Sequence, residues 1–438
     1  MNSAKKENYA LPIAMMFALF FMIAFVTGLP SPMGVIVAKQ FGASNFESQL
    51  GFFANFLAYA FMGLPAGLML KRYGYKFTAL SAVVVGFVGV GIQFLSGVAE
   101  SFSIYLAGAF VSGFSMCMLN TVVNPMLNTL GGEGKKGNQL LQFGSSLNSV
   151  GATITPVLVG YLMGDIAGRT IEKANPALFI AMGIFALVFF VLLFVRIPEP
   201  HMVKETNVSK VKDKYSPLSF RHFILGAIAI FIYVGVEIGI PSTLNLFMTS
   251  PLDGIINGEQ GAMGLGIDAT IAGTVVGTYW FLMLIGRLLG GLLGAKYSSK
   301  AMLTFVSSLG IIFLLSAIFS SVTTVVDMPV FQSDLSFGLT EVPISVMYLV
   351  LCGFCTSIMW GGIFNLAVEG LGKYTTAASG IFMVMVCGGG IIPLLQGYVA
   401  DISTYMTSYW VMMACMAYML FYALIGSKNV NKNIPVAA

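Results

Sequence analysis

Long apolar runs alternate with short polar stretches along the whole chain. Each apolar run has about 20 residues or more, which is enough to cross a bilayer as a helix. Several runs exceed the thickness of the hydrocarbon, which indicates tilt or helix ends that project beyond the lipid. We predict twelve spanning helices, with soft boundaries, at residues 10–38, 47–70, 77–98, 102–130, 139–164, 175–196, 222–249, 267–295, 301–321, 343–371, 376–400 and 405–426.

The longest charged stretch, residues 198–220, falls between the sixth and seventh apolar runs. A polar segment at this point leaves six predicted helices on each side of it. We therefore predict an N-terminal six-helix lobe at residues 1–197, a cytoplasmic linker at 198–220 and a C-terminal six-helix lobe at 221–438.

The two predicted lobes resemble each other in sequence. GLPS at Gly28–Ser31 matches GIPS at Gly239–Ser242, and GLMLKRYGYK at Gly67–Lys76 matches GLLGAKYSSK at Gly291–Lys300. Two further matches lie in register in the fourth and tenth runs and in the fifth and eleventh. Internal duplication around a central linker is typical of two-lobed secondary transporters, which bind their substrate between the repeats near the middle of the bilayer.

Composition supports a membrane location. The chain is 57% hydrophobic and only 9% charged, whereas soluble proteins average about 25% charged residues. The first apolar run is too long for a signal-peptide core, so we expect a retained helix. With twelve spans, 18 of the 22 Lys and Arg residues fall on one side of the membrane, three fall on the other side, and Arg287 lies within a helix. This imbalance predicts cytoplasmic termini and a multi-pass protein of the bacterial inner membrane.

Other functional classes find little support. The net charge of +4 gives no reason to expect nucleic-acid binding. No Walker A loop, Ser-His-Asp set or metal-ligand cluster is present, and Cys352-x-x-Cys355 has no second pair to complete a zinc site. We expect no enzymatic activity, no metal and no cofactor, and we expect a monomer.

Glu237 lies in the middle of a predicted helix. It follows Arg221 by 16 residues, or about 24 Å of helix. A charge at the bilayer centre costs roughly 2.5–3.5 kcal/mol, so it usually faces a cavity or a partner. Desolvation favours the protonated carboxyl, which suits proton transport; the ionised form could instead bind Na⁺ with a carbonyl freed by Pro241. The alternative is a protonated side chain that bonds a neighbouring helix.

Two further ionisable residues lie within predicted helices. Arg287 could donate to a sugar hydroxyl or to a carboxylate; it could also pair with Glu369 or extend toward the cytoplasm. Glu369 precedes Lys373 by one helical turn. We expect it near the cytoplasmic end, in a structural or gating ion pair.

Amide and aromatic side chains in these helices fit a sugar. Amides make paired contacts with hydroxyl groups, and aromatic rings cover the C–H face of a sugar ring. We expect two or three of the asparagines to contact substrate, Asn148 and Asn120 first, although an intramembrane Asn can also simply join helices. The candidates are Asn120, Asn124, Asn148, Asn245 and Asn365, with Tyr279, Trp280 and Trp360.

Several motifs resemble one family. GLMLKRYGYK is similar to the basic cytoplasmic loop of the major facilitator superfamily, with Lys71 and Arg72 as its charged pair, although Lys71 replaces the usual Asp. NTVVNPMLNTLG from Asn120 and IMWGGIFNLAVEGLGK from Ile358 resemble its fucose and glucose/galactose cation symporter branch. The resemblance implies an all-α fold of twelve transmembrane helices in two pseudo-symmetric six-helix bundles. We expect Lys71 and Arg72 to serve in gating or in an ion pair; the alternative is a turn that is basic only because it faces the cytoplasm.

The sequence departs from this branch at the coupling site. As the resemblance implies, fucose members use an Asp in helix 1 and a Glu in helix 4 for proton-linked sugar binding. Those positions hold Ser31 and Asn120 here, which cannot titrate, while the Asn of helix 5 corresponds to Asn148. We hypothesise that the ion-coupling carboxylate has moved from the Ser31 position to Glu237.

The sequence thus predicts a secondary active transporter. It would import a monosaccharide (a hexose, deoxyhexose or amino sugar) together with H⁺ or Na⁺ by alternating access. The alternative is an uncoupled facilitator or exporter of another small molecule on the same fold.

Overall fold

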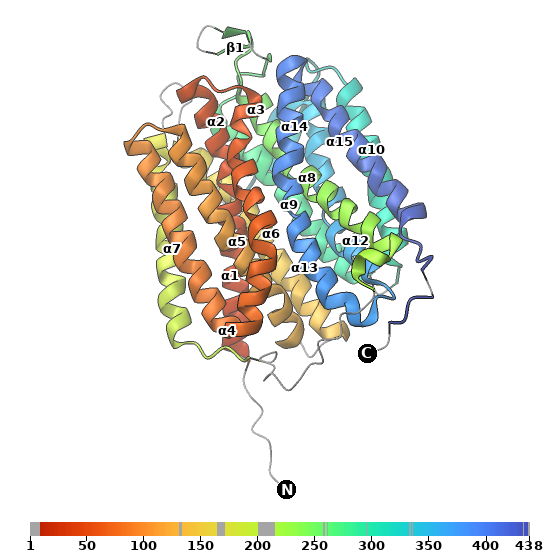
Figure 1. The fold of residues 1–438 in the computed structure, drawn as a ribbon. Helices are drawn as coiled ribbons and strands as arrows, with labels where there is room; N and C mark the ends of the chain where they lie inside the picture. The colour runs from red at the N-terminus through yellow and green to blue at the C-terminus, as the bar shows by residue number, and fades with distance from the viewer. Residues whose placement is uncertain are drawn as a thin grey trace.

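The computed structural model describes residues 9–130, 134–163, 171–199, 215–256, 259–260, 262–294, 296–332, 334, 336–431 and 433–436. Helices of the first half of the chain pack on one side of the molecule and helices of the second half on the other (Figure 1). We call the end that carries the loop at Lys71 the inner end, after the predicted cytoplasmic side, and the opposite end the outer end.

In the first half, the first predicted span is divided into two helices. Gly28 ends α1 and Pro30 begins α2, and Leu29 N donates to Val26 O at 3.3 Å. Leu29 itself has helical φ and ψ (−58° and −39°), and Met33 N donates to Leu29 O at 3.1 Å, so the GLPS motif perturbs the helix locally while residues 10–41 continue as one span. The helices are α1 (Ala10–Gly28), α2 (Pro30–Phe41), the short α3 (Asn45–Ser48), α4 (Leu50–Val98), α5 (Phe102–Leu130), α6 (Gly134–Met163) and α7 (Asn175–Phe194).

In the second half, the GIPS motif does not interrupt its helix. Pro241 lies inside α8, whereas the tenth and eleventh predicted spans are each divided in two. The helices are α8 (Arg221–Thr249), α9 (Ala269–Leu293), α10 (Ser299–Phe319), α11 (Ile344–Thr356), α12 (Met359–Val368), α13 (Thr375–Met385), α14 (Gly388–Ile402) and α15 (Tyr405–Phe421), followed by a π-helical turn, η5 (Tyr422–Gly426).

The structure accounts for all twelve predicted spans. Among the described residues, ten helical segments are long and apolar enough to cross a membrane. Of these, α4 has 49 residues, or about 74 Å, and crosses twice by turning at Gly74. The remaining span is α6, which is more polar than the others because its serines and Asn148 contact other helices. The predicted all-α membrane fold is confirmed.

Four short strands were not predicted. β1 (Ile255–Ile256) pairs with β2 (Glu259–Gln260), and β3 (Val325–Phe331) pairs antiparallel with β4 (Phe337–Pro343) between α10 and α11. The β3–β4 hairpin rests on α9: Phe331 N donates to Thr278 Oγ1 at 2.9 Å, and the Phe331 and Phe281 rings stack with centroids 5.6 Å apart. The hairpin thus covers the face of α9 that carries these two residues.

The turn inside α4 depends on a glycine and a carboxylate. Gly74 has φ of 84° and ψ of 177°, a conformation that is open essentially only to glycine. Glu199, at the start of the linker, accepts from Tyr75 N at 2.6 Å and Lys76 N at 3.0 Å. A Cβ on Gly74 would lie 2.5 Å from Glu199 Oε2.

Gly74→Ala should therefore destabilise the protein. Backbone strain alone costs about 1–3 kcal/mol, and the added methyl group would also displace Glu199. We expect a clearly lower apparent melting temperature in detergent. Gly67→Ala is the matched control, because nothing lies within 4 Å of its Cβ position. Equal melting temperatures for the two variants would contradict the role given to this turn.

Candidate functional site

A cavity of about 1830 Å³ lies between the two halves of the molecule. This is larger than the roughly 300–1,000 Å³ of typical ligand pockets. Its walls reach Lys71 and Tyr75, in the turn of α4, and Gly294 and Tyr297, just after α9. The cavity therefore extends to the inner end of the molecule.

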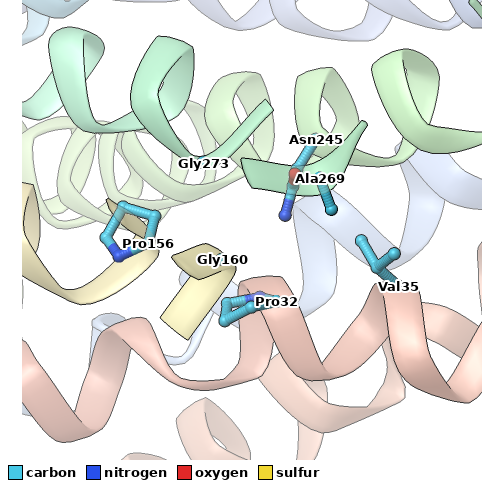
Figure 2. A pocket seen from close by; sticks show the side chains of 7 residues that line it. All are labelled: Pro32, Val35, Pro156, Gly160, Asn245, Ala269 and Gly273. Carbon is cyan, nitrogen blue, oxygen red and sulfur yellow. The ribbon is translucent and has the colours of Figure 1, made fainter. Parts of the chain in front are cut away.

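The outer end is closed where α6 meets α9. A Cβ on Gly273 would lie 2.5 Å from Pro156 O, so the two backbones are in direct contact, as small residues permit in membrane bundles. The residues of this outer seam surround a void of only about 10 Å³ (Figure 2), scarcely room for one water molecule. They are Pro32, Val35, Pro156, Gly160, Asn245, Ala269 and Gly273.

A charged pair lies in the wall of the cavity. Arg287 Nη2, from α9, donates to Glu237 Oε1, from α8, at 3.2 Å, and the two side chains are 12% and 15% exposed. Arg287 Nη1 donates to Ser145 O and to Ser149 Oγ of α6, each at 2.8 Å. One guanidinium therefore binds the carboxylate within its own half and also joins that half to the other.

Tyr279 donates a hydrogen bond to the backbone carbonyl that Pro241 leaves without a helical partner. Proline has no N–H, so the carbonyl of Glu237, four residues earlier, loses its helical partner. Tyr279 Oη donates to this carbonyl oxygen at 3.3 Å and lies 3.1 Å from Thr356 Oγ1. Tyr279 is fully buried and is not among the residues that line the cavity. It supports α8 from behind the cavity wall.

Three of the asparagines line the cavity in fixed orientations. Asn120 Nδ2 donates to Tyr59 Oη at 3.0 Å, Asn124 Nδ2 to Asn120 O at 2.8 Å, and Asn148 Nδ2 to Phe20 O at 3.1 Å. Asn120 Nδ2 also donates to Met116 O at 3.1 Å, so its amide donates twice while those of Asn124 and Asn148 donate once each. These bonds hold the three side chains at the wall. The arrangement keeps three polar groups of the first half in place without a ligand.

Of the other two asparagines, one lies at the inner mouth and one at the outer seam. Asn365 is exposed, lines the cavity and has Nδ2 3.5 Å from Ser299 Oγ. Asn245 donates from Nδ2 to both O and Oγ of Ser31, each at 3.3 Å, and does not line the cavity. Ser31 does line the cavity, so the segments that carry GLPS and GIPS meet at the outer end of the cavity.

Aromatic side chains of both halves line the cavity, and its two indole rings come from the second half. Trp280 and Trp360 both line the cavity. Tyr233, which sequence reasoning missed, lines it one helical turn before Glu237, with its ring centroid 6.3 Å from that of Trp360. Its four-residue spacing from Glu237 was the available signal, since such residues share a helix face.

The candidate gating residues lie apart from one another. Lys71 lines the inner mouth, and Arg72 lies over the Tyr73 ring at 5.3 Å. Glu369 is exposed at the end of α12, where its backbone oxygen is 3.0 Å from His222 Nε2. The carboxylate beside Arg287 is therefore Glu237 and not Glu369. The side chain of Lys373, the other suggested partner, lies outside the described residues.

Comparisons with known proteins agree with this architecture. A sequence profile of the Major Facilitator Superfamily matches residues 15–394. The glucose/galactose transporter of Brucella abortus is 28% identical over 431 residues, which cover 98% of this chain and 97% of that protein. The putative glucose/galactose transporter of Helicobacter pylori is 29% identical over 440 residues, covering 97% and 99%.

More distant relatives share the whole fold. The L-fucose-proton symporter of Escherichia coli K12 is 22% identical over 423 residues, covering 91% of this chain and 89% of that protein. The crystal structure of the transporter FucP in the outward conformation superposes with a TM-score of 0.66 at 21% identity, over 96% of this chain and all of the other.

Proposed function

Because the chain belongs to the major facilitator superfamily, we propose that it is a secondary active transporter that imports a monosaccharide together with a cation. The observation that carries this proposal is the inner cavity, in which amide and indole groups surround one carboxylate–guanidinium pair. Relatives named as glucose/galactose transporters and as an L-fucose-proton symporter favour a hexose or deoxyhexose over an amino sugar. We place the protein in the bacterial inner membrane with both termini in the cytoplasm.

A neutral polyhydroxylated substrate suits the walls of the cavity. Among its described lining residues, those with a formal charge are Glu237, Arg287 and Lys71, and the first two neutralise each other at 3.2 Å. Asn120, Asn124 and Asn148 supply hydroxyl partners, while the indoles offer flat apolar faces. We propose these three amides, with Trp280 and Trp360, as the sugar site.

Glu237 is the proposed coupling group, and the proton is the ion that its surroundings favour. Arg287 places a positive charge 3.2 Å from the carboxylate, which opposes Na⁺ binding there. The carbonyl freed by Pro241 already accepts from Tyr279, so it offers little to a metal ion. A proton needs no such ligands, and it would convert the ion pair to a neutral acid beside a free guanidinium.

The ion pair suggests an order of events. With Glu237 ionised, Arg287 holds α8, α9 and α6 together below the outer seam. This arrangement fits the stage after sugar and proton have left to the cytoplasm. Protonation weakens the attraction between the two side chains, so that Arg287 can turn toward sugar hydroxyls when the site next opens outward.

Uptake into proteoliposomes tests the proposed function. Purified protein would be supplied with radiolabelled glucose, galactose or L-fucose under an inward proton gradient, an inward Na⁺ gradient or no gradient. We expect at least tenfold greater accumulation of one sugar with the proton gradient, abolished by a protonophore. Equal uptake under all three conditions would refute symport. It would support the uncoupled facilitator, for which the absence of a titratable group at Ser31 and Asn120 is the observation in favour.

A further inference from the structure

Asp401, in the last turn of α14, makes a contact between the two halves at the outer end. Its Oδ1 accepts from Asn45 N and its Oδ2 from Phe46 N, both at 2.8 Å. Asn45 and Phe46 form the first turn of α3, which leads into α4. A carboxylate of the second half therefore caps a helix start of the first half, where negative charge is favourable.

The remaining N–H groups of this turn are satisfied within the first half. Ser44 Oγ accepts from Glu47 N at 3.2 Å, and Glu47 Oε2 accepts from Ser44 N at 2.9 Å, which makes a complete capping box. The first N–H groups of a helix have no partner inside the helix itself. Two of the four here depend on Asp401, so they lose their partner whenever the halves separate at the outer end.

A tyrosine strengthens the same junction. Tyr405 Oη donates to Asn45 Oδ1 at 2.5 Å and lies 2.7 Å from Ser250 Oγ. Both Asn45 and Tyr405 are buried, at 7% and 1% exposure. Gly397 allows the approach, since a Cβ there would lie 2.7 Å from Asn45 O. The contacts of Asp401 and Tyr405 with Asn45 and Phe46 are called the outer clasp below.

We propose that the outer clasp fastens the closed outer end, and that Asp401 is the positioning residue that sets the balance between inward-open and outward-open states. The clasp lies at the end opposite the cavity mouth, and every outward opening must break it. Breaking the outer clasp leaves two backbone N–H groups and the Asp401 carboxylate without their protein partners. This loss favours the state in which the outer end is closed. The proposal depends on the alternating opening of this fold and not on which sugar is carried.

A cysteine introduced into the outer seam would report the opening of the outer end directly. Val35 lines the void of the outer seam (Figure 2) and is 6% exposed, so Val35→Cys should react slowly with a membrane-impermeant maleimide added outside intact cells. Adding Asp401→Asn, which keeps the size and removes the charge, should raise the labelling rate about tenfold. Tyr405→Phe, which removes one hydroxyl contact, should raise it about threefold.

Glu47→Gln is the matched control. It removes a carboxylate from the same helical turn, but that carboxylate is exposed and bonds only within its own half, so the labelling rate should not change. Labelling after denaturation in detergent normalises the amount of protein, and the parent chain with Val35 intact gives the background. If neither Asp401→Asn nor Tyr405→Phe accelerates labelling, the proposal is overturned. Because no sugar is needed, this result is independent of the uptake experiment.

Discussion

Replacement of Glu237 by glutamine should abolish gradient-driven accumulation of sugar while leaving sugar exchange across the membrane. Glutamine keeps the size of the side chain and can still accept from Arg287, so the cavity should retain its shape. It cannot take up or release a proton. We expect at least a tenfold loss of accumulation under a proton gradient, measured in proteoliposomes, with counterflow of labelled sugar reduced by less than twofold.

Glu369→Gln provides the comparison for this variant. Glu369 is likewise a carboxylate of a membrane helix, but it lies at the end of α12, is exposed and stands apart from Arg287. Accumulation should be retained. If Glu237→Gln accumulates sugar as well as the parent protein, the coupling role of Glu237 is wrong, whatever the sugar is.

Loss of Arg287 should have the largest effect on the molecule as a whole. Arg287→Met removes the partner of Glu237 and both contacts to α6. Removing one partner of a buried ion pair lowers the free energy of unfolding by about 3–5 kcal/mol. These side chains face a cavity, so we expect a loss of about 1–3 kcal/mol in the free energy of unfolding, together with complete loss of uptake. Arg287→Lys should restore little, because one ammonium cannot replace two separate guanidinium nitrogens.

A double-mutant cycle separates the ion pair from the contacts to α6. Part of the cost of Arg287→Met comes from a carboxylate left without its partner, so the fall in melting temperature should be smaller in a Glu237→Gln background. An equal fall in both backgrounds would show that the two side chains are not energetically coupled, and it would remove the ion pair from the proposed cycle.

The fold could be predicted from the sequence because the hydropathy of each run indicates whether that segment lies in lipid or in water. The twelve apolar runs are local patterns, and the structure contains helices for all of them. The division into two lobes at residues 198–220 stays a prediction. GLPS and GIPS match in sequence but differ in structure: α8 continues through Pro241, and the carbonyl that Pro241 leaves free accepts from the hydroxyl of Tyr279, far along the chain. No local pattern carries that information.

The candidate site was harder to predict, since its parts come from several helices. Glu237 and Arg287 were both recognised as costly, but the choice of partner depends on how α8, α9 and α6 rotate against one another. Asn245 carries the same amide as Asn120, yet its position nearer the outer end directs it to Ser31 and away from the cavity. Asp401 was not recognised from the sequence, because its partners are backbone groups of a distant helix.

The polarity of α6 has a consequence for how the protein is made. A helix that carries Ser145, Asn148 and Ser149 is the least able of the twelve spans to leave the translocon for lipid alone. Asn148 and Thr155 donate to backbone oxygens of α1, at Phe20 and Phe25, so stable insertion of α6 depends on an α1 that is already in place. Substitutions that disturb α1 should therefore reduce the amount of protein in the membrane even where they leave the transport site untouched.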